Sequence, residues 1–204
     1  MMGMRQTCGI GIVGNYLPRR CGIATFTHDL AESLAERTGL EQPVLVCAMN
    51  DRPEGYAYPD RVRFEIRENY PVDYARAADF LNFSRVDVVS LQHEYGIFGG
   101  KGGSNILSLL RDLARPVVVT CHTVMEKPKP RHRDILREIA DRAHKLVVMS
   151  KKAFSLLDEV YDVNASKVVH IPHGIYDMPL VDPSFHKDAL RLQRRRVLLW
   201  FGLL

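Results

Sequence analysis

A histidine placed directly after a run of β-branched residues is the feature of this chain with the clearest chemical potential. Pro116 introduces the run Val117–Cys121, and His122 and Thr123 follow it. Such a run predicts a strand buried on both faces of a parallel α/β sheet, where ligands bind at the carboxyl ends of the strands. An imidazole at that edge can bind a sugar hydroxyl or a phosphate, or transfer a proton. The alternative is that His122 only ends the strand and hydrogen-bonds a neighbouring loop.

A second polar group follows an earlier apolar run. Gln92, His93, Glu94 and Tyr95 come in succession, and the glycine-rich segment 96–103 comes next. His93 and Glu94 do not form a helical zinc motif, since no second histidine follows four residues after the first. A loop that binds a sugar or an acceptor therefore fits better than a metal site. The alternative is a mobile surface loop with an exposed tyrosine.

The loop at residues 18–24 is the best candidate for an anion site. It runs into a predicted helix, so the free backbone N–H groups of residues 22–24 and the helix dipole favour a phosphate there. Arg19 and Arg20 add positive charge that can pair with phosphate oxygens. The alternative is a loop whose arginines are only solvated.

An earlier glycine pattern, Gly9–Gly14, matches the dinucleotide motif GxGxxG. That motif needs its glycines at a turn from a strand into a helix. Here they lie inside a predicted strand, and residues 15–18 follow in place of a helix. We therefore reject a nicotinamide site.

Two further polar positions follow predicted strands. Ser150 is an obvious N-cap for the next helix, and capping is the favoured role of its hydroxyl. His173 and Gly174 form a tight turn after Pro172. The basic segment 127–133 reads as a solvated loop, with contact to an anionic acceptor or an acidic membrane surface as the alternative.

The bulk properties are those of an ordinary globular protein. The chain has 204 residues, 46% hydrophobic and 25% charged, so disorder is not indicated. A net charge of +4 favours anionic ligands but is too small to indicate nucleic-acid binding. The four cysteines form no CxxC pair and read as reduced structural thiols. No apolar run has transmembrane length and no signal-peptide pattern is present, so we expect a cytoplasmic protein.

Alternating strand and helix patterns must position these residues. Strands are predicted at 8–13, 44–49, 62–66, 86–91, 117–121, 145–149 and 167–171, and helices at 22–37, 74–83, 104–113, 133–143 and 151–159. The first helix carries an apolar stripe of Ile23, Phe26, Leu30 and Leu34, and Ser104 is the expected N-cap of the third. This order predicts an α/β protein with a doubly wound, mainly parallel Rossmann-like sheet of about seven strands and helices on both faces.

The last residues follow a different pattern. Residues 182–196 are polar and end in a basic run, and an apolar strand is predicted to begin at Val197. Such a strand either completes the same sheet or opens a second domain.

The order and spacing of these loops resemble the N-terminal half of GT-B-fold glycosyltransferases, specifically the large retaining family 4. The resemblance runs from about residue 8 onward and rests on segments 18–24, 92–94, 119–123, 148–150 and 171–174. In that family the first loop commonly carries paired glycines, which map to Cys21 and Gly22, so one expected glycine is a cysteine here. The strand-end histidine maps to His122, which in family members contacts the transferred sugar near the reacting carbon.

The resemblance implies a transferase that moves a sugar from a nucleotide diphosphate sugar to a sugar or lipid-linked acceptor with retention, without a metal or other cofactor. His122 is the candidate catalytic residue. The candidate substrate-binding residues are Arg20, Cys21, Gly22, Ile23, His93, Glu94, Tyr95, Thr123, Ser150, His173 and Gly174.

The resemblance also predicts the domain organisation. Residues 1–180 form the acceptor-side domain, and residues 181–204 form a linker and the first strand of a truncated nucleotide-sugar-binding domain. We therefore expect the isolated chain to be inactive unless that domain is supplied in cis or in trans. Two alternatives stay open: a non-catalytic binding module of the same fold, and half of a sugar-nucleotide epimerase, for which Glu94 is the prominent carboxylate.

Overall fold

The computed structural model describes residues 8–38, 43–175, 177 and 179–198. The chain divides into two compact units, Met1–His173 and Gly174–Leu204. The first unit contains the sheet and the candidate site.

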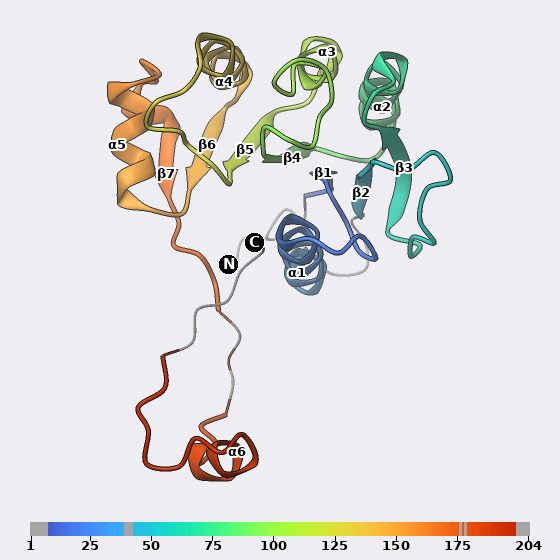
Figure 1. The fold of residues 1–204 in the computed structure, drawn as a ribbon. Coiled ribbons are helices and arrows are strands. Elements are labelled where there is room, and N and C mark those ends of the chain that lie inside the picture. Colours follow the sequence, from blue (N-terminus) through green and yellow to red (C-terminus); the bar gives the residue numbers. More distant parts are fainter. Residues whose placement is uncertain (1–7, 39–42, 176, 178, 199–204) are drawn as a thin grey trace, which may run out of the picture. The chain divides into compact units, whose positions relative to one another are not determined.

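The first unit is built on a seven-stranded, wholly parallel sheet with strand order β3-β2-β1-β4-β5-β6-β7 (Figure 1). The strands are β1 (Ile10–Gly14), β2 (Val44–Asn50), β3 (Val62–Arg67), β4 (Val88–His93), β5 (Val117–Cys121), β6 (Lys145–Val148) and β7 (Val168–His170). The helices of this unit are α1 (Gly22–Thr38), α2 (Pro71–Phe83), α3 (Ile106–Asp112), α4 (Pro130–Arg142) and α5 (Lys151–Glu159), with a short 3₁₀ helix at Ala165–Lys167. The predicted fold class is confirmed, including the number of strands.

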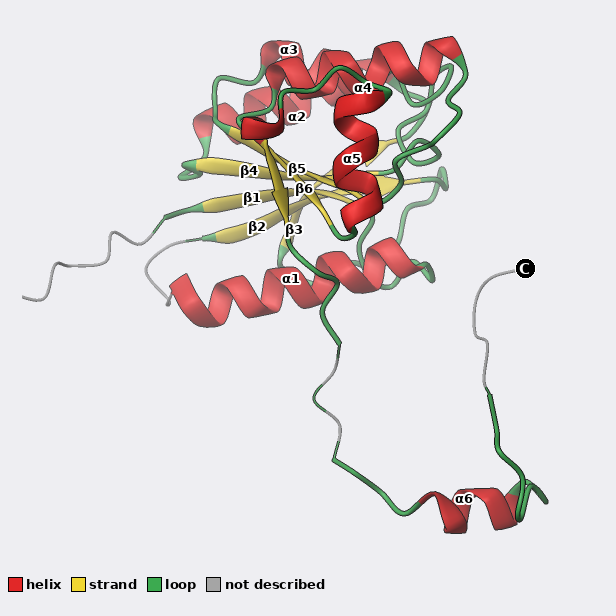
Figure 2. Cartoon of the chain, turned by 90° about the vertical axis from the view of Figure 1, so that its left-hand side faces the viewer, coloured by secondary structure: helices red, strands yellow, loops and turns green. Residues whose placement is uncertain are grey.

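The helices lie on both faces of the sheet. Helices α2, α3 and α4 cover one face and α1 lies on the other, as Figures 1 and 2 show. Right-handed crossovers explain this arrangement, because the chain leaves β1 toward β2 but leaves β3 and each later strand in the opposite direction. The strand order therefore reverses between β1 and β4, and the carboxyl ends of these two strands mark the crevice where ligands bind in such sheets.

Two apolar clusters match the two faces. The larger lies between the sheet and α2–α5 and includes Leu157 of α5, and the smaller lies between the sheet and α1. In α1 the residues buried against the sheet are the small ones Ala24, Thr27 and Ala31. The predicted apolar stripe lies beside that line, and its members are partly buried: Ile23, Phe26, Leu30 and Leu34. Ile23 and Leu34 pack against the apolar clusters. Small side chains let the helix backbone approach the sheet closely, and the larger ones pack beside it.

Strand β5 is buried on one face and half-buried on the other. Val117, Val119 and Cys121 belong to the large cluster, whereas Val118 is partly exposed. Helix α1 packs on β1 and β2 rather than on β5, so it does not cover Val118. The prediction of burial on both faces therefore holds for only part of this strand.

One glycine of the GxGxxG sequence serves close packing between the sheet and helix α2. A Cβ on Gly11 would lie 2.7 Å from Leu81 Cδ2 of α2. The glycines lie in and beside β1, and a loop, not a helix, follows them. This agrees with the rejection of a dinucleotide motif.

Two other local predictions differ from the structure. Helix α3 begins at Ile106, and the residue before it, Asn105, makes no side-chain cap, so Ser104 is not the N-cap. The second unit contains a helix that the polar pattern did not reveal, α6 (Pro183–Ala189), whose N-cap Asp182 accepts a hydrogen bond from Ser184 N at 2.9 Å. The strand expected from Val197 is not formed at residues 197–198, and its remainder, 199–204, lies outside the described residues.

Among the helices in the described part of the chain, none combines the length and the hydropathy that a membrane span requires.

Candidate functional site

The candidate site lies at the carboxyl ends of β1, β4 and β5. Strand β1 pairs with β4 and β4 with β5, so the loops that follow them start side by side. His93 is the last residue of β4 and His122 the first residue after β5. The predicted grouping of these polar residues at one edge of the sheet is confirmed.

The two histidines face opposite sides of the sheet. His93 lies level with Cys121 in the strand register, and like Cys121 it is buried on the side of the large cluster. There its ring packs against Tyr95 and Phe98, with centroids 5.0 and 5.9 Å away. His122 comes one residue later and faces the α1 side, because successive side chains of a strand alternate between faces.

His122 is held by three contacts. Its backbone N–H donates to the carbonyl of His93 at 3.0 Å, and its ring Nε2 lies 3.1 Å from Oε1 of Gln92. The ring of Phe26 from α1 meets the imidazole edge-on, with centroids 4.8 Å apart, and the same phenyl ring lies 5.5 Å from His173. These contacts fix both the position and the plane of the imidazole.

Both histidines are neutral near pH 7. Burial, and to a lesser degree the nearby His173, lower the pKa of His122 from 6.5 to about 4. Burial, with a smaller effect of His122, lowers the pKa of His93 to about 3. A neutral imidazole can accept a hydrogen bond from a ligand, which an imidazolium cannot.

A pocket of about 510 Å³ opens beside His122. It lies between the loop after β5 and the start of α5, and its lining includes His122, Thr123, Glu126, Ser150 and Lys152. The Ser150 hydroxyl caps α5 by accepting from Ala153 N at 3.1 Å, as the sequence predicts. Three of the predicted site residues therefore share one pocket: His122, Thr123 and Ser150.

The carboxylate of Glu94 joins two loops of the site. Thr123 Oγ1 donates to its Oε2 at 2.5 Å, and the backbone N–H of Tyr95 donates to its Oε1 at 2.8 Å. Both carboxylate oxygens are therefore engaged. This geometry makes Glu94 a group that holds the loop after β4 against the loop after β5.

Tyr95 lies in the core, in contrast to the exposed tyrosine of the alternative interpretation. Its ring is only 6% exposed, and its hydroxyl lies 3.3 Å from that of Tyr161. The Tyr161 hydroxyl donates in turn to the carbonyl of Met125 at 3.0 Å. Sequence reasoning missed Tyr161, because nothing in its local pattern shows that it reaches a loop 36 residues earlier.

The loop before α1 is organised around Cys21. Its sulfur accepts hydrogen bonds from Ala24 N and from Asn15 Nδ2, both at 3.3 Å. Arg19 donates to Asn15 Oδ1 at 3.2 Å and forms an ion pair with Asp51 at 3.3 Å.

The other predicted residues of that loop differ in exposure. Arg20 and Gly22 are exposed, and a Cβ on Gly22 would meet no atom within 4 Å. Ile23 is partly buried and packs against the large cluster. His173 ends the first unit, and Gly174 begins the second and is described with it. The binding roles predicted for these residues stay predictions.

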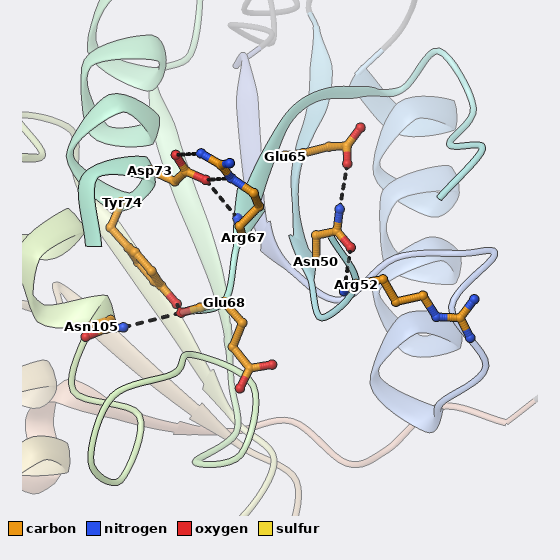
Figure 3. A network of polar contacts seen from close by, with 8 residues as sticks. All are labelled: Asn50, Arg52, Glu65, Arg67, Glu68, Asp73, Tyr74 and Asn105. Atoms are coloured by element: carbon orange, nitrogen blue, oxygen red, sulfur yellow. Dashed lines mark hydrogen bonds and ion pairs between the residues drawn. The ribbon is translucent and has the colours of Figure 1, made fainter. Parts of the chain in front are cut away.

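Sequence reasoning also missed a polar network at the carboxyl ends of β2 and β3, which Figure 3 shows. Asn50 Nδ2 donates to Glu65 at 2.8 Å, and the Arg67 guanidinium forms a two-pronged contact with Asp73 at 2.7 and 3.0 Å. Next to it, the carbonyl of Glu68 accepts hydrogen bonds from two further side chains of the network, Tyr74 and Asn105. A pocket of about 320 Å³ adjoins this network.

Within the described residues, no group of three or more His, Cys, Asp or Glu side chains is arranged to hold a metal ion.

Comparison with known proteins identifies the family. A family model described as Glycosyltransferase Family 4 matches residues 21–177. The chain belongs to glycosyltransferase family 4. The matched region includes every candidate site residue except Arg20.

A solved structure supports the fold of this family 4 chain. The chain is similar to the crystal structure of a glycosyltransferase from Rickettsia africae ESF-5, with a TM-score of 0.61 and 14% sequence identity. The similarity covers 91% of this chain and 50% of that chain, so this chain spans about half the length of the Rickettsia protein. A comparison with curated protein sequences found no match.

Proposed function

We propose that this family 4 chain supplies the acceptor-side half of a retaining glycosyltransferase. The family match over residues 21–177 is the observation that carries the proposal. The reaction transfers a sugar from a nucleotide diphosphate sugar to a sugar or lipid-linked acceptor. No metal or other cofactor is required in this proposal.

The geometry of the site supports this assignment. His122 follows β5 at the carboxyl edge of the sheet, next to β4, where the strand order reverses, and it lines a pocket of about 510 Å³. A neutral imidazole with one ring nitrogen held by Gln92 can hydrogen-bond a hydroxyl of the transferred sugar. The exposed start of α1, with open space over Gly22, offers the backbone N–H groups of Gly22 and Ile23 to a diphosphate. The N–H of Ala24, which was also expected to be free, is used by the sulfur of Cys21.

Transfer also needs a unit that holds the nucleotide. The chain spans half of the Rickettsia protein. We therefore propose that residues 1–180 provide the acceptor side. The nucleotide is then bound mainly by a separate nucleotide-sugar-binding domain, supplied in cis or in trans. The 204 residues alone are then not sufficient for transfer.

The contacts of Glu94 favour transfer over epimerisation. An epimerase needs a base that is free to remove a proton from carbon, whereas both oxygens of Glu94 are occupied by Thr123 and by the backbone of Tyr95. The remaining alternative, a binding module without catalysis, differs from the proposal only in turnover, which the experiment below measures.

The acceptor is the less defined substrate. The basic segment 127–133 carries charges that are partly used inside the protein, since Arg133 pairs with Asp162 at 2.8 Å and Arg131 Nε donates to the carbonyl of Lys101 at 2.8 Å. We propose a sugar or lipid-linked acceptor in the cytoplasm, with peripheral contact to an acidic membrane surface if the acceptor is a lipid. No nucleic acid takes part.

The test measures sugar transfer from a panel of nucleotide sugars by the longest natural form of the protein, and by the 204-residue chain alone. In the natural form we expect His122→Asn to lower turnover by about 100-fold, because it removes a contact made to the reacting sugar. The affinity for the nucleotide should change by less than about threefold.

A matched change, His186→Asn in the exposed helix α6, should leave both quantities unchanged. Equal losses of turnover and of affinity in His122→Asn would contradict the role of His122. Transfer by the 204 residues alone would contradict the assignment of the chain as one half of the enzyme.

A further inference from the structure

Three side chains on the α1 side of the sheet form a hydrogen-bonded chain. Ser90 and Gln92 belong to β4, and His122 follows the neighbouring strand β5. Gln92 Nε2 donates to Ser90 Oγ at 2.9 Å, and Gln92 Oε1 lies 3.1 Å from Nε2 of His122. Gln92 is fully buried, so water does not compete for its amide group.

The orientation of this amide determines the proton position on His122. Because the amide nitrogen of Gln92 donates to Ser90 Oγ, the amide oxygen of Gln92 faces the imidazole. An amide oxygen can only accept hydrogen bonds. Nε2 of His122 must therefore carry the proton. In a neutral ring the other nitrogen, Nδ1, then has a lone pair and accepts hydrogen bonds.

The surroundings keep the ring in this state. The lowered pKa of His122 leaves the imidazole uncharged at neutral pH. Phe26 meets the ring edge-on and fixes its plane. Among the residues that the structure describes, only Gln92 forms a hydrogen bond with the ring.

The space that Gln92 occupies depends on a glycine of β1. A Cβ on Gly14 would lie 2.8 Å from Gln92 Cβ and 3.3 Å from Gln92 Cγ. The glycine therefore leaves room for the glutamine side chain on the α1 side of the sheet. This explains the last glycine of the GxGxxG sequence without a nucleotide.

We propose that Gln92 is a positioning residue that holds the imidazole of His122 with the proton on Nε2, so that Nδ1 accepts a hydrogen bond from a ligand hydroxyl. The group recognised by His122 is then a hydrogen-bond donor, such as a sugar hydroxyl, and not a phosphate oxygen. This identification of the ligand group rests on the proposed function, whereas the tautomer and the role of Gln92 do not.

The experiment is nitrogen NMR of the histidine rings in the full chain at pH 7, without ligand. Two-bond proton–nitrogen spectra separate a protonated ring nitrogen from one with a lone pair, and His122→Asn identifies the signals of His122 by their loss. We expect His122 with the proton on Nε2 only. A ring with the proton on Nδ1, a charged ring, or an even mixture of both tautomers would overturn the proposal.

Two variants test whether Gln92 is the cause. Gln92→Met keeps the length of the side chain but removes the acceptor, and Ser90→Ala removes the anchor of the amide. In each, the share of the Nε2-protonated ring should fall toward the mixture of an unrestrained imidazole. Gln193→Met, the same change at a residue outside the site, should leave the spectrum of His122 unchanged. An unaltered tautomer in both site variants would exclude a positioning role for Gln92.

The outcome is distinct from that of the transfer assay. If His122 has the expected tautomer but no nucleotide sugar is used, the proposed function fails and the role of Gln92 stands. If transfer occurs with the reverse tautomer, the proposed function stands and the role of Gln92 fails.

Discussion

The sulfur of Cys21 takes the position that a serine or aspartate oxygen holds at the start of many helices. It precedes Gly22, the first residue of α1, and accepts a hydrogen bond from the backbone of Ala24. It also accepts from the side chain of Asn15, which joins the loop to the end of β1. A residue that replaces an expected family glycine thus has a structural role of its own, since a glycine could accept neither bond through a side chain.

We predict that Cys21→Ala lowers the free energy of unfolding by about 1 kcal/mol, the usual effect of losing an N-cap. Cys21→Ser keeps an acceptor at the same place and should retain most of the stability. Urea denaturation followed by circular dichroism measures both values. Equal stabilities of the alanine and serine variants would show that the sulfur does not cap α1.

At the scale of elements, the absence of a side chain at Gly14 of β1 leaves room for Gln92 of the neighbouring strand β4 on the α1 side. We predict that Gly14→Ala lowers the free energy of unfolding by about 1 to 3 kcal/mol, because the added methyl group overlaps the side chain of Gln92. Denaturant unfolding gives this value, and the ring spectrum of His122 should change in the same variant.

Gly96→Ala is the matched control. A Cβ on this exposed glycine would meet no atom within 4 Å, so the same change should cost little there. If Gly14→Ala and Gly96→Ala lose the same stability, the packing of Gly14 against Gln92 is not the reason for a glycine in β1.

Most strands could be predicted well because they are compact apolar runs, whereas β3 was predicted from apolar residues that alternate with charged ones. The observed bounds differ from the predicted ones by only a few residues. The face that a helix buries was harder to predict. In α1 the largest apolar residues suggest one face, but the sheet selects Ala24 and Ala31 because they allow a close approach. Hydrophobicity indicates which residues can be buried, and the distance between layers decides which ones are.

For the candidate site, the sequence predicted where the polar residues lie but not which way their side chains point. His93 and His122 could be placed at one edge of the sheet from their positions after apolar runs. Their opposite directions could not be predicted, because these depend on the register that pairs His93 with Cys121. The contacts of Gln92 with His122 and of Tyr161 with Met125 join segments 30 or more residues apart in the chain, and no local sequence pattern indicates them.

At the scale of the whole molecule, the two neutral histidines make stability depend on pH. Their pKa values in the folded state, about 4 for His122 and about 3 for His93, lie below the ordinary 6.5. The unfolded chain therefore binds more protons than the folded one between these values. We predict that stability is fully present above about pH 6.5 and is lost as the pH falls toward 3, by at most about 1.4 kcal/mol per pH unit for each ring.

Denaturant unfolding between pH 4 and 8 measures this dependence. His93→Phe removes the more buried titrating ring and should flatten the slope below about pH 6.5. His186→Phe, at an exposed histidine of α6, serves as the matched control and should leave the slope unchanged. The prediction is refuted if His93→Phe and the wild type lose stability in parallel.

The position of β1 in the centre of the sheet has a consequence for biosynthesis. β1 pairs on one side with β2 and on the other with β4, and Gly9 N reaches the carboxylate of Asp87, 78 residues later, at 2.8 Å. During translation the ribosome therefore releases β1 long before the strand that completes its second edge exists. Until residue 93 has emerged, that edge offers free backbone N–H and C=O groups to any other nascent chain. A pause in synthesis between β2 and β4 therefore lengthens the time during which this edge can pair with a wrong strand.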